Sequence, residues 1–387
     1  MNQVSALFIG ASNAGVSFWR LYSWAIAAQR VKAFHAFLPF WDKAQTETAP
    51  WEVDLEDPMY RKRILDELDD HVKKADVVVS QMVHTPAALD LLRGIKVMYP
   101  HIPLVSEIDD NILSTPTYNP ADAVYQPGSV FRHIAVEQFK MSDAMVVSTP
   151  YLAEVYSEFN ANIHVVPNSL DFRIWDNLKH RRNTDLVRIG WAGGASHEED
   201  LRLIEVVVRK TLEKHKNVRF CFVHGIPDFF RGVDRIENFS QFTRIDRYPQ
   251  FLASRAFDIG LAPLVDNAFN RGKSNLRWLE YAGLKVPCVA SSVGHFAETI
   301  RSGIDGMLCN TESQWLSALD DLILNANVRR QMGNAANKRA RKDFNIEANV
   351  HNYARILSAI ADKGQVHKIV DPSIVPAEAG QVLEAHE

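Results

Sequence analysis

Short apolar runs alternate with longer amphipathic segments along most of the chain. In the first half, these runs predict strands at Val4–Ile9, Ala33–Phe37, Val77–Ser80, Leu104–Ile108, Ala144–Ser148 and Ile163–Val166. The second half predicts strands at Val187–Trp191, Val218–His224, Ile259–Pro263 and Val286–Ser291, and helical periodicity occurs at Trp19–Arg30, Arg61–Lys74 and Pro86–Leu92. Strands and helices that alternate at this spacing form βαβ units. The pattern therefore predicts an α/β protein with two doubly wound, Rossmann-like parallel sheets.

A polar segment without periodicity, residues 172–186, separates the two series of strands, as linkers between domains do. We therefore place a first domain at residues 1–178 and a second at residues 185–345. A last amphipathic helix is predicted at residues 346–363. The final residues, 364–387, carry two prolines and scattered charge, and they predict a flexible tail.

Composition and charge narrow the possible functions of this globular chain of 387 residues. Residues 1–180 contain 15 Lys and Arg against 22 Asp and Glu, a net −7, whereas the rest of the chain is +3. Because phosphate contacts need clustered cations, the acidic first half argues against general nucleic-acid binding. The three cysteines match no metal-ligand spacing, and no apolar run approaches the ~18 to 20 residues of a membrane span. We expect a cytoplasmic protein.

The most informative segment follows the predicted strand Ile259–Pro263. Open α/β sheets bind ligands beyond the carboxyl ends of their strands, and this strand leads into a polar loop and a helix that begins near Ser274. A helix N-terminus beside Lys273 is a physical site for an anion, because free amides and a full positive charge face the ligand. Glu280, about two turns further on, is suited to accept hydrogen bonds from a diol. The first glycine loop, residues 10–15, lacks the spacing of a dinucleotide fingerprint.

Four ordered segments resemble the signature of GT-B glycosyltransferases, specifically glycosyltransferase family 4. ValProAsnSerLeuAsp at 166–171 resembles the family's "PNGVD", and residues 189–201 resemble the strand and glycine loop that open its donor domain. Residues 248–264 resemble the stretch that ends in "DiglaPl", and residues 276–291 resemble "GLxxLEAxAxGxPVVAS". The resemblance implies two Rossmann-like domains that face a cleft, an acceptor domain followed by a nucleotide-sugar donor domain, with the C-terminal helix packing back on the first domain.

The resemblance also assigns roles to individual residues of the donor domain. It implies that Glu280 binds the ribose hydroxyls and that Lys273, with the amides of Ser274 and Asn275, holds the diphosphate. Gly193 and Gly194 would let the donor-domain loop approach that diphosphate, and His197 would lie at its edge.

Two departures from the family pattern stand out. Gly272 occupies the position of the first glutamate of the family's E-x7-E pair, so the usual carboxylate contact to the transferred sugar is missing. The first donor-domain loop also lacks the Arg and Lys that many members place there. The phosphate charge is therefore expected to fall on Lys273 and on Arg271.

The acceptor half offers Asp109 and Asp110 directly after the strand Leu104–Ile108. In family members the corresponding loops line the point of sugar transfer, so we take both as candidate catalytic residues, with Lys273. The same segment can be interpreted as a metal-binding D-x-D motif. We favour a reaction without a metal, because basic side chains and helix N-termini neutralise the leaving diphosphate in GT-B enzymes.

The sequence thus predicts a retaining, metal-independent hexosyltransferase of glycan biosynthesis. Its donor would be a UDP- or GDP-linked sugar, with no further cofactor, and its acceptor a glycan, a lipid-linked or another hydroxyl compound. Weak peripheral contact with a membrane is compatible with the family. Two alternatives stay open: a non-catalytic, GT-B-like nucleotide-binding subunit, which the glycine at 272 favours, and a glycosyltransferase that acts on modified DNA.

Overall fold

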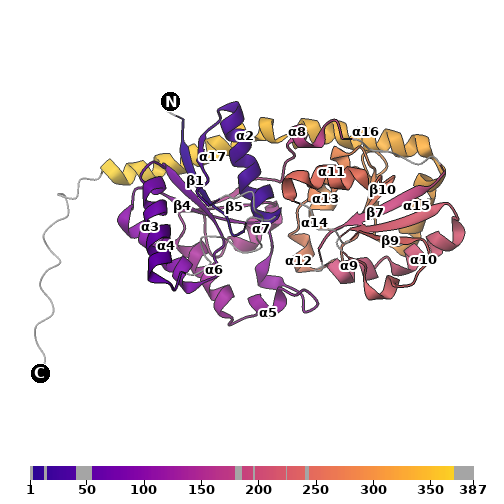
Figure 1. The fold of residues 1–387 in the computed structure, drawn as a ribbon, viewed down its shortest axis with the longest axis horizontal. Coiled ribbons are helices and arrows are strands. Elements are labelled where there is room, and N and C mark those ends of the chain that lie inside the picture. The colour runs from indigo at the N-terminus through magenta and orange to yellow at the C-terminus, as the bar shows by residue number, and fades with distance from the viewer. Residues whose placement is uncertain are drawn as a thin grey trace, which may run out of the picture.

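The chain forms two α/β domains that lie side by side (Figure 1). A computed structural model describes residues 3–12, 15–40, 55–178, 185–194, 197–223, 225–239 and 244–369. The first domain contains the strands β1 (Ser5–Ile9), β2 (His35–Phe37), β3 (Val77–Gln81), β4 (Leu104–Ile108), β5 (Ala144–Val147) and β6 (Ile163–Val165). The second contains β7 (Val187–Ala192), β8 (Val218–Val223), β9 (Ile236–Phe239), β10 (Ile259–Ala262), β11 (Cys288–Ser291) and β12 (Met307–Cys309).

Each domain is built on one six-stranded sheet. The strand orders are β2-β1-β3-β4-β5-β6 and β12-β11-β10-β7-β8-β9, and all the paired strands run parallel. In each sheet the chain reverses its winding direction once, between β1 and β3 and between β7 and β10. Such switch points open a crevice at the carboxyl ends of the strands. The predicted doubly wound architecture of two Rossmann-like domains is confirmed.

Helices cover both sheets, and their sequences explain where several of them begin. The helices of the first domain are α1 (Gly15–Ser17), the π-helical turn η1 (Phe18–Tyr22), α2 (Ser23–Val31), α3 (Pro58–Val72), α4 (Pro86–Met98), α5 (Asp122–Tyr125), α6 (Val130–Met141) and α7 (Pro150–Tyr156). Asp57, Thr85 and Thr149 each cap a helix whose first residue is proline. A polar side chain accepts the free amides of the first turn, and proline has no amide to satisfy, so each helix starts sharply.

The helices of the second domain continue this arrangement. They are α9 (Glu198–Arg202), α10 (Glu205–Lys214), α11 (Tyr248–Ser254), α12 (Ala268–Arg271), α13 (Leu276–Gly283), α14 (Gly294–Thr299), α15 (Glu312–Leu324) and α16 (Ala326–Asp343), and α8 (Phe172–Trp175) lies in the connection between the domains. Helix α16 carries several basic residues, but its face with Met332, Ala336 and Ala340 is buried. None of the described helices is long and apolar enough to cross a membrane.

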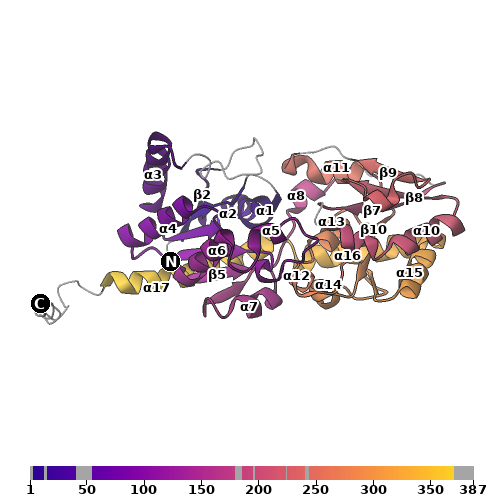
Figure 2. The same ribbon diagram turned by 90° about the horizontal axis from the view of Figure 1, so that it is seen from below.

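The last helix, α17 (Ile346–Ile369), returns to the first domain. Helices α16 and α17 run along one side of both domains (Figures 1 and 2). The ring of Tyr353 in α17 packs edge-on against Phe8, Trp24 and Phe34 of the first domain. Leu170 pairs with Asn345 in an isolated parallel bridge, so the two crossings of the chain between the domains lie next to each other.

Some predicted boundaries differ from the structure. Strands β9 and β12 were not predicted, because both are short edge strands. The sequence of β9 mixes apolar and polar residues, and the apolar run of β12 is only three residues long. Helix α17 continues past residue 363 to Ile369, which shortens the predicted tail, and residues 370–387 lie outside the described residues.

A buried ion pair occupies the centre of the first domain. Nε of Arg20 in η1 lies 2.6 Å from Oε1 of Glu107 in β4, and both side chains are 0% exposed. Gln81 donates to the other carboxylate oxygen of Glu107 at 2.8 Å, and Nη1 of Arg20 donates to Asn168 at 2.9 Å. This network connects the carboxyl ends of β3 and β4 to the segment that leads into the second domain.

Removing the Arg20 charge should destabilise the first domain strongly. In Arg20→Met, Glu107 remains buried without its partner, so we expect a loss of about 3 to 5 kcal/mol in the free energy of unfolding by urea. The double variant with Glu107→Gln should recover part of this loss, because no unpaired charge remains. The exposed pair of Lys62 and Asp66 offers a control, and Lys62→Ala should cost about 0.5 kcal/mol or less. If Arg20→Met lost as little unfolding free energy as this control, the stabilising role of the Arg20–Glu107 pair would be contradicted.

Candidate active site

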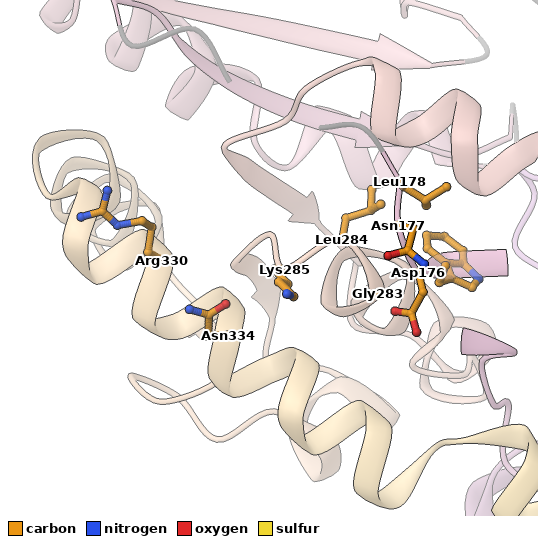
Figure 3. Close-up of a pocket in the computed structure, with 9 residues that line it drawn as sticks. Asp176, Asn177, Leu178, Gly283, Leu284, Lys285, Arg330 and Asn334 are labelled. Atoms are coloured by element: carbon orange, nitrogen blue, oxygen red, sulfur yellow. The ribbon is translucent and has the colours of Figure 1, made fainter. Parts of the chain in front are cut away.

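Two cavities have to be compared as candidate sites. The larger, about 460 Å³, lies between α16 and the connection of the domains (Figure 3). Arg330 and Asn334 of α16 face it from one side, with Asp176 and Asn177 opposite. It contains none of the predicted site residues, and Arg341 already pairs with Asp176. We therefore do not assign the donor site to this cavity.

The second cavity, about 270 Å³, lies where the carboxyl ends of the two sheets face each other. Its walls combine loops that follow β1, β4, β7 and β10 with the N-terminal half of α13. The lining residues are Val16, Asp109, Asp110, Ala192, Gly193, His197, Tyr248, Leu264, Lys273, Ser274, Leu276, Arg277, Glu280 and Phe296. Seven predicted site residues are thus brought together: Asp109, Asp110, Gly193, His197, Lys273, Ser274 and Glu280.

Glu280 is a buried carboxyl at one end of this cavity, on helix α13. Its side chain accepts a hydrogen bond of 3.3 Å from the hydroxyl of Tyr248, at the start of α11. Burial raises the pKa of Glu280 to about 7, and the positive charge of Arg277 opposes this rise. A carboxyl with this pKa changes charge near neutral pH, and in its ionised form it is a strong acceptor for a diol.

Lys273 and the two aspartates meet across the cavity. Nζ of Lys273 lies 3.1 Å from Oδ1 of Asp110 and 4.4 Å from the centre of the Phe269 ring. Burial, with the negative charges of Asp110 and Glu107, raises the pKa of Asp109 to about 7, while Arg20 and Lys273 oppose this rise. The cavity therefore collects carboxyls from the first domain and a cation from the second.

Arg277, which was not among the predicted site residues, lies one helical turn before Glu280. Its guanidinium carbon stands 5.2 Å from the centre of the Trp191 ring. A Cβ on Gly193 would lie 2.8 Å from Nη2 of Arg277 and 2.5 Å from Cζ2 of Trp191. Gly193 therefore leaves room for these two side chains, in addition to any ligand. The spacing of i and i+3 between Arg277 and Glu280 was the available signal, since it places both on one face of a helix.

Ser274 and Asn275 precede the first turn of α13. The helix was predicted to begin near Ser274, and its N-cap residue is Asn275. The hydroxyl of Ser274 accepts a hydrogen bond of 2.7 Å from Nδ2 of Asn168 in the first domain. Asn275 does not line the cavity, and its side chain donates to Thr299 at 3.2 Å.

His197 also lines the cavity. Its Nδ1 is 2.7 Å from Oδ2 of Asp200, and burial lowers the pKa of the imidazole despite this contact. The other oxygen of Asp200 accepts from the amide of Val265 and from Asn270. Asp200 thereby connects the β7 loop to the loop that carries Lys273.

Besides Asn275, two further predicted site residues lie outside the cavity. Arg271 is exposed and pairs with Asp266 at 2.7 Å. Its charge is therefore compensated outside the cavity. Gly194 lines a neighbouring cavity of about 210 Å³ beside the β8 loop, which includes Gly225. We do not use either residue in the proposals below.

Gly272, where the family has a glutamate, lies against the first domain. A Cβ at this position would lie 2.9 Å from Cδ2 of Leu152 and 3.2 Å from Cβ of Asn111. Thr149 donates to the carbonyl of Gly272 at 3.3 Å, and Asn111 donates to the carbonyl of Ala268 at 3.1 Å. A side chain at 272 would therefore disturb this contact between the domains, which explains the departure in physical terms.

Part of the chain is similar to a known protein family. Residues 207–355 match a family described as glycosyl transferase-like. No curated protein matches the chain significantly. Among the described residues, no group of three or more His, Cys, Asp or Glu side chains is placed to hold a metal ion.

Several solved structures share the fold over nearly the whole chain. Sucrose-phosphate synthase from Thermosynechococcus elongatus is 13% identical with a TM-score of 0.64, and the match covers 94% of this chain and 100% of that one. HepE from Anabaena, in complex with UDP and glucose, is 14% identical with a TM-score of 0.62 over 92% and 100% of the chains. A glycosyltransferase from Rickettsia africae is 15% identical with a TM-score of 0.60 over 93% and 99%. The predicted resemblance to GT-B glycosyltransferases is confirmed, whereas membership of family 4 stays a prediction.

The raised pKa of Glu280 leads to a prediction for stability. Between the usual pKa of a glutamate, 4.5, and about 7, the unfolded chain is ionised at this position while the folded chain holds the proton. The free energy of unfolding should therefore fall as the pH rises through this range, by an amount on the order of 3 kcal/mol. Glu280→Gln removes this dependence, so its stability relative to wild type should increase between pH 5 and pH 8. Glu312→Gln, at an exposed carboxylate, should show the same pH dependence of stability as wild type. Parallel curves of unfolding free energy against pH for wild type and Glu280→Gln would refute the raised pKa of Glu280.

Proposed function

We propose that this protein is a glycosyltransferase that moves a sugar from a nucleoside-diphosphate donor to an acceptor hydroxyl. The observation that carries this proposal is the cavity at the switch point of the second sheet, which faces the carboxyl end of the first. It combines a buried carboxyl, two cations beside a helix N-terminus, and two carboxyls of the opposite domain. Such a cavity suits a ligand with a diol at one end and a diphosphate near the other.

The donor is bound, in this proposal, along helix α13. Glu280 accepts hydrogen bonds from the ribose diol, and Lys273 stabilises the diphosphate together with the amides at the start of the helix. The complexes of HepE contain UDP, UDP and glucose, or UDP-glucose. This likeness makes UDP-linked sugars the first donors to test, and GDP-linked sugars the second.

These positions support the following reaction. The acceptor oxygen forms a bond to the anomeric carbon, the bond from that carbon to the diphosphate oxygen breaks, and the acceptor proton passes to the leaving phosphate. By resemblance to family 4, attack occurs on the face that the diphosphate leaves, so the anomeric configuration is retained. Asp109 and Asp110 orient the acceptor hydroxyl, while Lys273 stabilises the charge on the leaving group without a metal.

The acceptor would enter from the first domain. Its segment around Tyr118 approaches the donor domain, where Nδ2 of Asn267 donates to the Tyr118 hydroxyl at 2.8 Å. Polar groups of this kind beside the site suit a hydroxylated acceptor such as a glycan. A lipid-linked acceptor, peripheral contact with a membrane and a cytoplasmic location stay predictions from the sequence.

The glycine at 272 favours a second candidate, a subunit that binds the nucleotide without transferring the sugar. A panel of UDP-, GDP- and ADP-glucose separates the two functions. We expect one donor class to release its nucleoside diphosphate. This release should be slow when water is the acceptor of the sugar and faster with a suitable acceptor. Saturable binding without any release would favour the non-catalytic subunit, and no binding across the panel would refute both.

Lys273 supplies the sharpest test of the catalytic assignment. Lys273→Ala should lower turnover by roughly 100- to 1,000-fold, because it removes a charge that stabilises the leaving diphosphate. The melting temperature should change little, since the side chain is on the cavity wall. Lys338→Ala, at an exposed position of α16, is the matched control and should keep wild-type turnover. Near-normal transfer by Lys273→Ala would refute the phosphate role of Lys273.

A further inference from the structure

We propose that Arg277 is a direct ligand of the donor diphosphate and holds it together with Lys273. This inference rests on the proposed function and adds a residue that the motifs do not indicate. Arg277 lines the cavity one turn before Glu280, on the helix whose N-terminus faces the same space. The diphosphate site would therefore be built mainly from α13 and from Lys273, two residues before the N-cap Asn275.

The guanidinium of Arg277 lacks a partner where one is needed. Its Nη1 atom is buried and has no hydrogen-bond partner among the described residues. A buried polar atom without a partner costs free energy, and this cost is larger for a charged group. An anion in the cavity would supply the missing acceptor. The unpaired N–H donor of Arg277 therefore indicates a ligand site, because it does not stabilise the protein without a ligand.

The position of the guanidinium is fixed by its neighbours. The ring of Trp191 lies 5.2 Å from the guanidinium carbon, a distance at which cation and ring attract each other. Gly193 leaves the space that Nη2 occupies, because a Cβ there would approach it to 2.8 Å. A cation held in place before the ligand arrives loses little entropy on binding, and the planar fork of arginine matches two phosphate oxygens.

The carboxyls of the cavity do not neutralise this charge. Lys273 is within 3.1 Å of Asp110, whereas no carboxylate of the described residues lies within ion-pair distance of Arg277. Glu280 interacts with Arg277 only at longer range, where the positive charge lowers the pKa of the carboxyl. Arg277 is thus the cation of the cavity that a bound anion would pair with.

A series of ligands with a growing number of phosphates tests this inference. Isothermal titration would measure the affinity of wild type, Arg277→Gln and Arg277→Lys for uridine, UMP and UDP, or for the guanosine series if wild type prefers GDP. We expect Arg277→Gln to lower the UDP affinity by roughly 10- to 100-fold, while uridine changes less than about twofold. Arg277→Lys should recover part of the loss, because it keeps the charge but not the fork. Arg330→Gln, at an exposed position of α16, controls for the loss of a positive charge elsewhere in the domain.

The results separate this inference from the proposed function. Equal losses for uridine and UDP in Arg277→Gln would mean that Arg277 acts through Glu280 or through the fold, and would overturn the inference. An unchanged UDP affinity would overturn it as well, while donor binding by wild type would leave the proposed function standing. Failure of wild type to bind any nucleotide of either series would overturn both.

Discussion

The close contact between the loop that carries Lys273 and the first domain is the constraint on which the site depends. Gly272 approaches Leu152 so closely that a side chain would not fit, and its carbonyl accepts from Thr149. Ser274 accepts from Asn168, whose position the buried Arg20 fixes. Because of this contact, the carboxyl ends of both sheets form one cavity. The contact also leaves little room at position 272 for the glutamate that the predicted resemblance to family 4 would place there.

The electrostatics of the cavity follow from its position between two sheets. Burial raises the pKa values of Glu280 and Asp109 to about 7. Nearby cations oppose this rise at both residues, and the hydrogen bond from Tyr248 opposes it at Glu280. Charged groups that are costly in an empty cavity become useful when a ligand of complementary charge replaces water. Lys273 and Arg277 are arranged for a diphosphate, and Glu280 is arranged for a diol. The positive excess of the second half of the sequence contributes to this arrangement only in part, because many of its basic residues lie on α16.

The fold was predictable because its central strands are apolar runs, and an apolar run of four to six residues between helices leaves few alternatives. Edge strands such as β9 lack this signal. The ordered motifs located Glu280 and Lys273 in the cavity, because their spacing from a strand end fixes their place on the sheet edge. The i, i+3 spacing places Arg277 on the same helix face as Glu280, but the sequence does not show which of Arg271 and Arg277 lines the cavity. That difference arises from the fold. Asp266 pairs with Arg271, and the fold brings Trp191, 86 residues earlier in the chain, next to Arg277.

A crystal structure with bound UDP tests the central claim most directly, namely that the cavity between the two sheets holds a nucleotide-sugar donor. The account predicts the ribose diol within hydrogen-bond distance of Glu280 and the diphosphate between Lys273 and Arg277. Nucleotide bound outside this cavity, for example between Arg330 and Asp176, would contradict it.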